Sequence, residues 1–266
     1  MLSSALGVTL QSCTAPQAPN QKLVLTGSSS VAPLAAAIAK RYEKLHPQVR
    51  IDVQTGGSSR GIADVRQKVA DIGMVSRALK PAEQDLKSYT LAQDGISIIL
   101  HRDNPISKLS NQQIVDIYTG KIKNWQQVGG QDAAITVVNK AEGRSTLELF
   151  IQYFKLTAKD IQADVVIGDN EQGIKTVVGN PQAIGYVSIG AADINIKQGT
   201  ALKLLPINGI AATFSTVQDG SFPLSRPLNL ITQGQVSPKQ QAFIDFAQSS
   251  VVEDLVKEQG FVPHAQ

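Results

Sequence analysis

Residues 23–31 read LVLTGSSSV, and this stretch decides the fold. An apolar strand ends at a glycine, three serines follow, and the helix that we expect over residues 32–45 begins. The first turn of a helix has unpaired backbone N–H groups and carries the positive end of the helix dipole. Serine hydroxyls add further hydrogen-bond donors, so the natural guest of such a loop is a small anion.

The same arrangement occurs twice more along the chain. Residues 56–61 read GGSSRG after a strand expected at 49–54, and residues 142–146 read EGRST after a strand expected at 135–139. Glycine–serine loops alone are more often tight turns and helix caps than ligand sites. Three of them in one chain, two with an arginine, favour convergence on one oxyanion.

Strands and helices alternate from Lys22 onward, which is typical of a mainly parallel α/β sheet with helices on its faces. Ligands of such sheets bind beyond the carboxyl ends of the strands, where the glycine–serine loops lie. Residues 135–187 form a second α/β set, residues 209–227 are predicted to be irregular, and residues 237–258 to be helical. We therefore expect two α/β lobes between which the chain crosses twice.

The expected domains follow from this pattern. Residues 22–95 together with 210–262 are predicted to form lobe 1, and residues 96–209 to form lobe 2. Residues 1–21 are predicted to be a signal or lipoprotein anchor followed by a flexible spacer.

Cys13 ends the run LQSC, residues 10–13, which resembles a bacterial lipoprotein signal whose cysteine is lipidated. The usual basic residues are missing, because the first lysine is Lys22, and an incidental cysteine is the alternative. Lipidation would place the protein in the periplasm or on the outer face of the cytoplasmic membrane. The lipid anchor would then be its contact with the membrane.

The composition excludes several classes of partner. The formal net charge of the 266 residues is +3 and only 5% are aromatic, which argues against nucleic acid. A single cysteine excludes an intrachain disulfide. The three histidines are scattered and show no metal-ligand spacing, so neither a metal nor a cofactor is predicted.

Six runs, in this order along the chain, resemble the phosphate-binding subfamily of periplasmic substrate-binding proteins, the receptors of phosphate ABC transporters. They are LTGSSSVAPL (25–34), GGSSRGI (56–62), ADIGMVSR (70–77), IYTGKIKNW (117–125), NPQAIGYV (180–187) and FPLSRP (222–227). The resemblance implies a two-lobed α/β fold of the periplasmic-binding-protein type II (Venus flytrap) kind. It also implies a monomer that binds inorganic phosphate between its lobes and passes it to a membrane permease.

The resemblance further implies which residues contact phosphate. They are Ser29, Ser30, Val31, Ser58, Ser76, Arg77, Lys140, Arg144, Ser145 and Thr146. Three of these residues are cations, and which of them carries the largest share of binding stays open. Arg77 could equally pair with a carboxylate such as Glu142. Lys140 is the weaker candidate, since the planar guanidinium of Arg144 binds oxyanions with two hydrogen bonds.

Ser76 stands where many relatives have an aspartate, whose carboxylate accepts the proton of phosphate and so rejects sulfate. A hydroxyl can donate or accept a hydrogen bond. A receptor for sulfate, molybdate or another tetrahedral oxyanion is therefore an alternative, and so is a phosphate sensor. A serine-dependent hydrolase is disfavoured, because the chain lacks a Gly-x-Ser-x-Gly elbow and a P-loop ending. We expect the protein not to be an enzyme.

Overall fold

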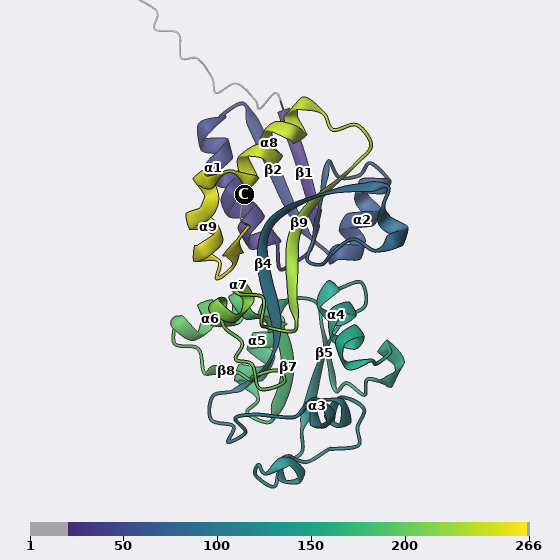
Figure 1. Ribbon diagram of the computed structural model, residues 1–266, viewed down its shortest axis with the longest axis vertical. Helices are drawn as coiled ribbons and strands as arrows, with labels where there is room; N and C mark the ends of the chain where they lie inside the picture. The colour runs from purple at the N-terminus through teal and green to yellow at the C-terminus, as the bar shows by residue number, and fades with distance from the viewer. Residues whose placement is uncertain (1–20, 265–266) are drawn as a thin grey trace, which may run out of the picture.

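Two α/β lobes joined by two long strands make up residues 21–264, the part of the chain that this computed structural model describes (Figure 1). The predicted two-lobed α/β fold is confirmed. The predicted anchor, with Cys13, lies outside the described residues except for Gln21, the first residue of a strand. Within residues 21–264, no helix combines the length and the apolar character that crossing a bilayer requires.

Lobe 1 is built around three parallel strands, in which β1 pairs with both β2 and β3. Its elements are β1 (Gln21–Gly27), α1 (Ala32–Leu45), β2 (Val49–Thr55), α2 (Ser58–Arg66), β3 (Ile72–Val75), the 3₁₀ turns η1 (Pro81–Glu83) and η4 (Ser250–Val252), α8 (Pro238–Gln248) and α9 (Glu253–Glu258). Helix α1 begins with a proline in its first turn, where a missing N–H costs nothing. It buries Leu34, Ile38 and Tyr42 against the sheet and α8.

Lobe 2 has a smaller parallel set, in which β5 pairs with β6 and β7. Its elements are α3 (Asn111–Tyr118), η2 (Trp125–Val128), β5 (Thr136–Lys140), α4 (Ser145–Phe154), η3 (Ala158–Asp160), β6 (Val165–Ile167), α5 (Asn170–Gly179), β7 (Ala183–Ser188), α6 (Ile189–Lys197), β8 (Leu202–Leu204) and α7 (Phe214–Gln218). The rings of Phe150 and Tyr186 stack at 4.0 Å in its core, beside Tyr118.

Strands β4 (Leu86–His101) and β9 (Ser225–Gln233) connect the lobes and run side by side through the middle of the molecule (Figure 1). The first part of β4 pairs with β9, and its second part pairs with β7 and β8. Strand β9 also pairs with β3, and the short β10 (Val262–Pro263) pairs with β4. One continuous sheet, in the order β2-β1-β3-β9-β4-β7-β5-β6, therefore spans both lobes.

Several expectations about individual elements were wrong. The sheet is mixed, not mainly parallel, because both connecting strands pair antiparallel with their neighbours. The predicted helix at 237–258 is interrupted at Ser249, whose extended backbone ends α8 before α9 begins. The region 209–227, expected to be irregular, contains α7 and the start of β9.

Residues 210–224 pack differently from the expected division into lobes, so we propose a revised division. Val217, Phe222 and Leu224 are buried in the hydrophobic core of lobe 2, together with Ile96 and Tyr186. This segment therefore lies with lobe 2 and not, as expected, with lobe 1. We place the two crossings near residue 95 in β4 and at the start of β9.

Candidate functional site

Arg226, on connecting strand β9, is 1% exposed and contacts both lobes. Its Nη2 donates to Ser30 Oγ at 3.0 Å, and its Nη1 donates to Ser76 Oγ at 3.2 Å. Both serines belong to lobe 1. The same Nη1 donates to Thr146 Oγ1 of lobe 2 at 3.1 Å. One guanidinium thus brings together three residues that the sequence singled out.

Asp94 holds Arg226 in this position from the neighbouring strand β4, where the two residues face each other in register. Its Oδ2 accepts from Arg226 Nη2 at 2.9 Å and from Nε at 3.2 Å, and both side chains are buried. A carboxylate on one side of the planar guanidinium fixes the direction of the remaining N–H groups. Sequence reasoning missed both residues, although Arg226 lies in the run FPLSRP.

Lys140, the last residue of β5, is 2% exposed. Its Nζ donates to the backbone oxygen of Asp169 at 2.6 Å and to Asn170 Oδ1 at 3.2 Å. Within residues 21–264, no carboxylate forms an ion pair with this amine. Burial lowers the pKa of Lys140 to about 7, and the positive charges of Arg226 and Arg144 lower it as well.

Arg144 precedes α4 and lies between the lobes. A Cβ atom at Gly57 of lobe 1 would come within 2.9 Å of Arg144 Cδ, and one at Gly168 of lobe 2 within 3.3 Å of its Nη2. Gly57 has a φ of 96° as well, so both conformation and space require glycine there. In the described part of the chain, the Arg144 guanidinium has neither a hydrogen bond nor an ion pair.

Ser145, the first residue of α4, is 2% exposed, and its Oγ has no hydrogen-bond partner among the described residues. A buried hydroxyl without a partner costs free energy, so each such group requires an explanation. This hydroxyl lies next in sequence to Arg144 and to Thr146, which contacts Arg226. A ligand in this place would give it a partner.

Of the remaining predicted residues, Ser58 and Val31 form hydrogen bonds near this cluster. Ser58 Oγ accepts from the backbone N–H of Ser76 at 3.2 Å. The backbone N–H groups of Ser30 and Val31 donate to Ser28 Oγ at 3.2 and 3.4 Å, so Ser28 caps this loop from within. Ser28, not singled out from the sequence, orders the loop that carries Ser30.

Arg77 is paired with acidic side chains outside this cluster. It is 4% exposed and donates to both carboxylate oxygens of Glu83, at 2.7 and 2.8 Å. Its Nε also lies 2.9 Å from Glu148 Oε2 of lobe 2. The alternative of an ion pair therefore describes Arg77, with Glu83 and Glu148 in place of the expected Glu142.

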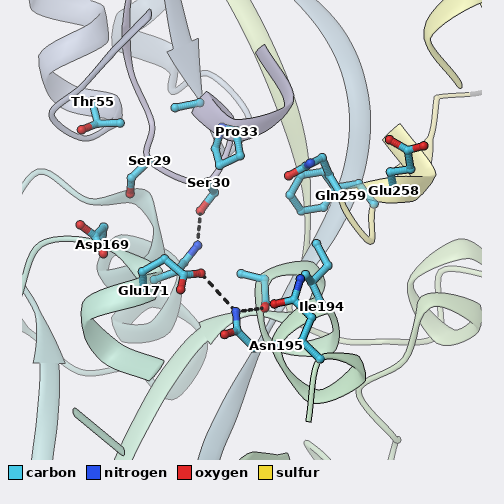
Figure 2. A pocket seen from close by; sticks show the side chains of 15 residues that line it. Ser29, Ser30, Pro33, Thr55, Asp169, Glu171, Ile194, Asn195, Glu258 and Gln259 are labelled. Carbon is cyan, nitrogen blue, oxygen red and sulfur yellow. Dashed lines mark hydrogen bonds between the residues drawn. The ribbon is translucent and has the colours of Figure 1, made fainter. Parts of the chain in front are cut away.

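A cavity of about 510 Å³ adjoins the cluster between the two lobes. Figure 2 shows Ser29 and Ser30 above it and Asp169 and Glu171 below it. The amide of Asn170, in lobe 2, donates to Ser30 Oγ of lobe 1 at 3.1 Å. The cavity thus reaches the loop from which Ser30 contacts Arg226.

Three basic side chains lie close together in this cluster. Lys140, Arg144 and Arg226 interact through their charges, and the carboxylate of Asp94 pairs with Arg226 alone. Like charges in a buried place are costly unless an opposite charge joins them. Together with hydroxyls from both lobes, this arrangement can bind an oxyanion. The described residues contain no group of His, Cys, Asp and Glu that could hold a metal ion.

Comparisons with known proteins cover the same two lobes. A family model described as a PBP superfamily domain matches residues 14–251. The chain is 30% identical over 254 residues to the phosphate-binding protein PstS of Borreliella burgdorferi, covering 91% of this chain and 90% of that protein.

The solved structures that are similar to this one include the following two. A phosphate ABC transporter substrate-binding protein from Clostridium perfringens, with bound phosphate, has a TM-score of 0.84 and 34% identity, covering 92% of this chain and 100% of that chain. An ABC-type phosphate transport receptor from Vibrio cholerae has a TM-score of 0.75 and 32% identity, covering 91% and 100%.

Proposed function

Because the chain belongs to the family of PstS phosphate-binding proteins, we propose that it captures inorganic phosphate between its lobes for an ABC transporter. The observation that carries this proposal is the group of three basic side chains between the lobes, the buried Lys140 and Arg226 and the partly buried Arg144, with which only Asp94 forms an ion pair among the described residues. Ser30, Ser76 and Thr146, which the sequence predicts as ligand residues, accept hydrogen bonds from the Arg226 guanidinium.

Capture works by closure of the two lobes. Ser30 and Ser76 come from lobe 1, Thr146 and Ser145 from lobe 2, and Arg226 from a connecting strand. A ligand that contacts both lobes binds the closed state better than the open state, and this difference in affinity shifts the population toward closure. A permease that recognises the closed state would then bind mainly protein that carries phosphate.

A receptor for a wider range of tetrahedral oxyanions is the second candidate, favoured by the serine at position 76 and by the pairing of Asp94 with Arg226. The carboxylate of Asp94 is occupied by Arg226, and Ser76 Oγ accepts from Arg226 Nη1. Rejection of sulfate would then depend on hydroxyl and amide acceptors. These can reorient, so they penalise a fully ionised anion less than a carboxylate does.

The proposal includes the location of the protein, its lipid anchor and its partner. We place the protein in the periplasm or on the outer face of the cytoplasmic membrane, as a monomer that is lipidated at Cys13 and has a membrane permease as its partner. A binding role without catalysis is supported by the names of the relatives, which are phosphate-binding or phosphate transport proteins.

Titration calorimetry of phosphate into ligand-stripped protein, with and without excess sulfate, tests the proposal. One-to-one phosphate binding that sulfate leaves undisturbed is the expected result. Equal competition by sulfate would favour the wider oxyanion receptor. Absence of heat with either anion would contradict both.

A further inference from the structure

The hydrogen bonds of Lys140 match an uncharged amine. Its Nζ has two acceptors in the protein, the backbone oxygen of Asp169 and the side-chain oxygen of Asn170. A neutral amine has two N–H groups, one for each of these acceptors, whereas an ammonium group has three. The third hydrogen of the charged form therefore has no acceptor among the described residues.

The charges that face Lys140 come from three different elements. They are Arg226 on β9, Arg144 before α4, and Asp169 and Glu171 at the start of α5. On β7, the hydroxyl of Tyr186 accepts a hydrogen bond from the backbone N–H of Lys140 at 3.4 Å. The two arginines disfavour a third positive charge, and the two acidic residues favour it.

We propose that Lys140 is uncharged in much of the empty protein at neutral pH and takes up a proton from solvent when the oxyanion binds. This inference rests on the proposed function, since it needs an anion between Arg144 and Arg226. The step is –NH₂ + H⁺ → –NH₃⁺, with no other bond made or broken. The third N–H then donates to the anion, so Lys140 becomes a ligand only when the ligand is present.

The sign of the pH dependence follows. In the empty protein the pKa of Lys140 is about 7, and a bound anion raises it, since opposite charge favours the ammonium form. The contribution of Lys140 to affinity is complete below pH 7. It is lost as the pH rises from about 7 toward the pKa of the complex, by up to about tenfold in affinity per pH unit for one proton.

The test compares the wild type with Lys140→Arg, whose guanidinium stays charged at every accessible pH. Phosphate binding is measured between pH 6 and pH 9, and at pH 8 in two buffers of different ionisation enthalpy, which gives the protons taken up. Phosphate itself titrates in both proteins equally. The wild type is expected to take up close to one proton more than the variant, and its affinity to fall more steeply with pH.

Lys203→Arg is the matched control, because burial lowers the pKa of this lysine of β8 as well, away from the cluster. It should take up protons as the wild type does.

Carbon-13 resonances of the lysine side chains provide a second measurement, which needs no variant. One lysine should titrate near pH 7 without phosphate and above pH 8 with it.

Two results would overturn the inference while leaving the proposed function intact. One is phosphate binding with equal proton uptake in wild type and Lys140→Arg. The other is a wild-type spectrum in which every lysine titrates above pH 9 without phosphate. Absence of phosphate binding at pH 6 would instead contradict the proposed function.

Discussion

Two clusters of basic side chains lie between the lobes, and they differ in the source of their counter-charge. In the first cluster, Asp94 pairs with Arg226, whereas Lys140 and Arg144 have no ion pair among the described residues. In the second, which we call the Glu148 bridge, Glu148 of lobe 2 lies 2.9 Å from Arg77 Nε and 2.6 Å from Lys80 Nζ of lobe 1. Glu83 gives Arg77 a second carboxylate.

The two clusters differ in whether their basic side chains are paired with carboxylates of the protein. Basic side chains that pair with carboxylates of the protein already have their counter-charge. Basic side chains without such a pair are those to which we propose that an anion from solution binds. Both clusters connect the lobes, so we expect both to affect closure but only the first to select the ligand.

Loss of Arg226 should have the largest effect. In Arg226→Ala the buried carboxylate of Asp94 is left unpaired, and the contacts to Ser30, Ser76 and Thr146 vanish. We expect a loss of about 3 kcal/mol or more in both stability and phosphate binding, which is at least about a hundredfold in affinity. Calorimetry and denaturant unfolding measure the two effects.

Arg77→Ala is the matched control, because Arg77 is an equally buried arginine with carboxylate partners. It should lose similar stability and keep phosphate affinity within about tenfold. An equal loss of affinity in both variants would show that the two clusters do not differ as described.

Arg144→Ala should weaken phosphate binding by about 10- to 100-fold, the range of one or two charge-assisted hydrogen bonds. Its guanidinium has no partner in the described protein, so the unfolding free energy should hardly change. A stability loss larger than the binding loss would assign Arg144 a structural role.

Ser145→Ala should weaken binding by about three- to tenfold, the effect of one neutral hydrogen bond, and should not reduce stability. Ser110 is the matched serine, since its Oγ accepts from the backbone N–H of Gln113 and caps α3. Ser110→Ala should lose about 1 kcal/mol of stability and keep its affinity. The reverse pattern would contradict a ligand contact by Ser145.

Glu148→Gln should have the smallest effect. Its side chain is partly exposed and that of Lys80 is mostly so, which screens their attraction. We expect phosphate affinity to fall about two- to fivefold, through faster release, because the open state is favoured. Stopped-flow release rates at low and high salt check this, and unchanged rates would remove the Glu148 bridge from the account of closure.

Helices and strands whose apolar residues recur at a regular spacing could be predicted from the sequence. The helix expected over 32–45 has these bounds in the structure, since apolar residues recur on one face and a proline follows. Strand β4 was recognised only over residues 95–100, because its first half mixes polar and apolar residues without alternation. Helix α6 follows β7 directly, without the loop that usually separates two elements.

Some residues of the candidate site could likewise be predicted from the sequence, and others could not. That Ser30, Ser76 and Thr146 lie close together could be predicted, because each belongs to a short glycine- or serine-containing run that follows a strand. Arg226 could not, because its role depends on β9 lying beside β3 and β4, strands more than 120 residues away in sequence. Arg77 lies in one of those runs, but Glu148, which binds it across the lobes, is brought near only by the fold.

A crystal structure of the protein grown with phosphate tests the central claim most directly. The account predicts the anion between Arg226, Arg144 and Lys140, with Ser145 Oγ within hydrogen-bond distance and Arg77 still paired with Glu83 and Glu148. Phosphate bound to Arg77 or Lys80, with the cluster around Arg226 unchanged, would contradict it.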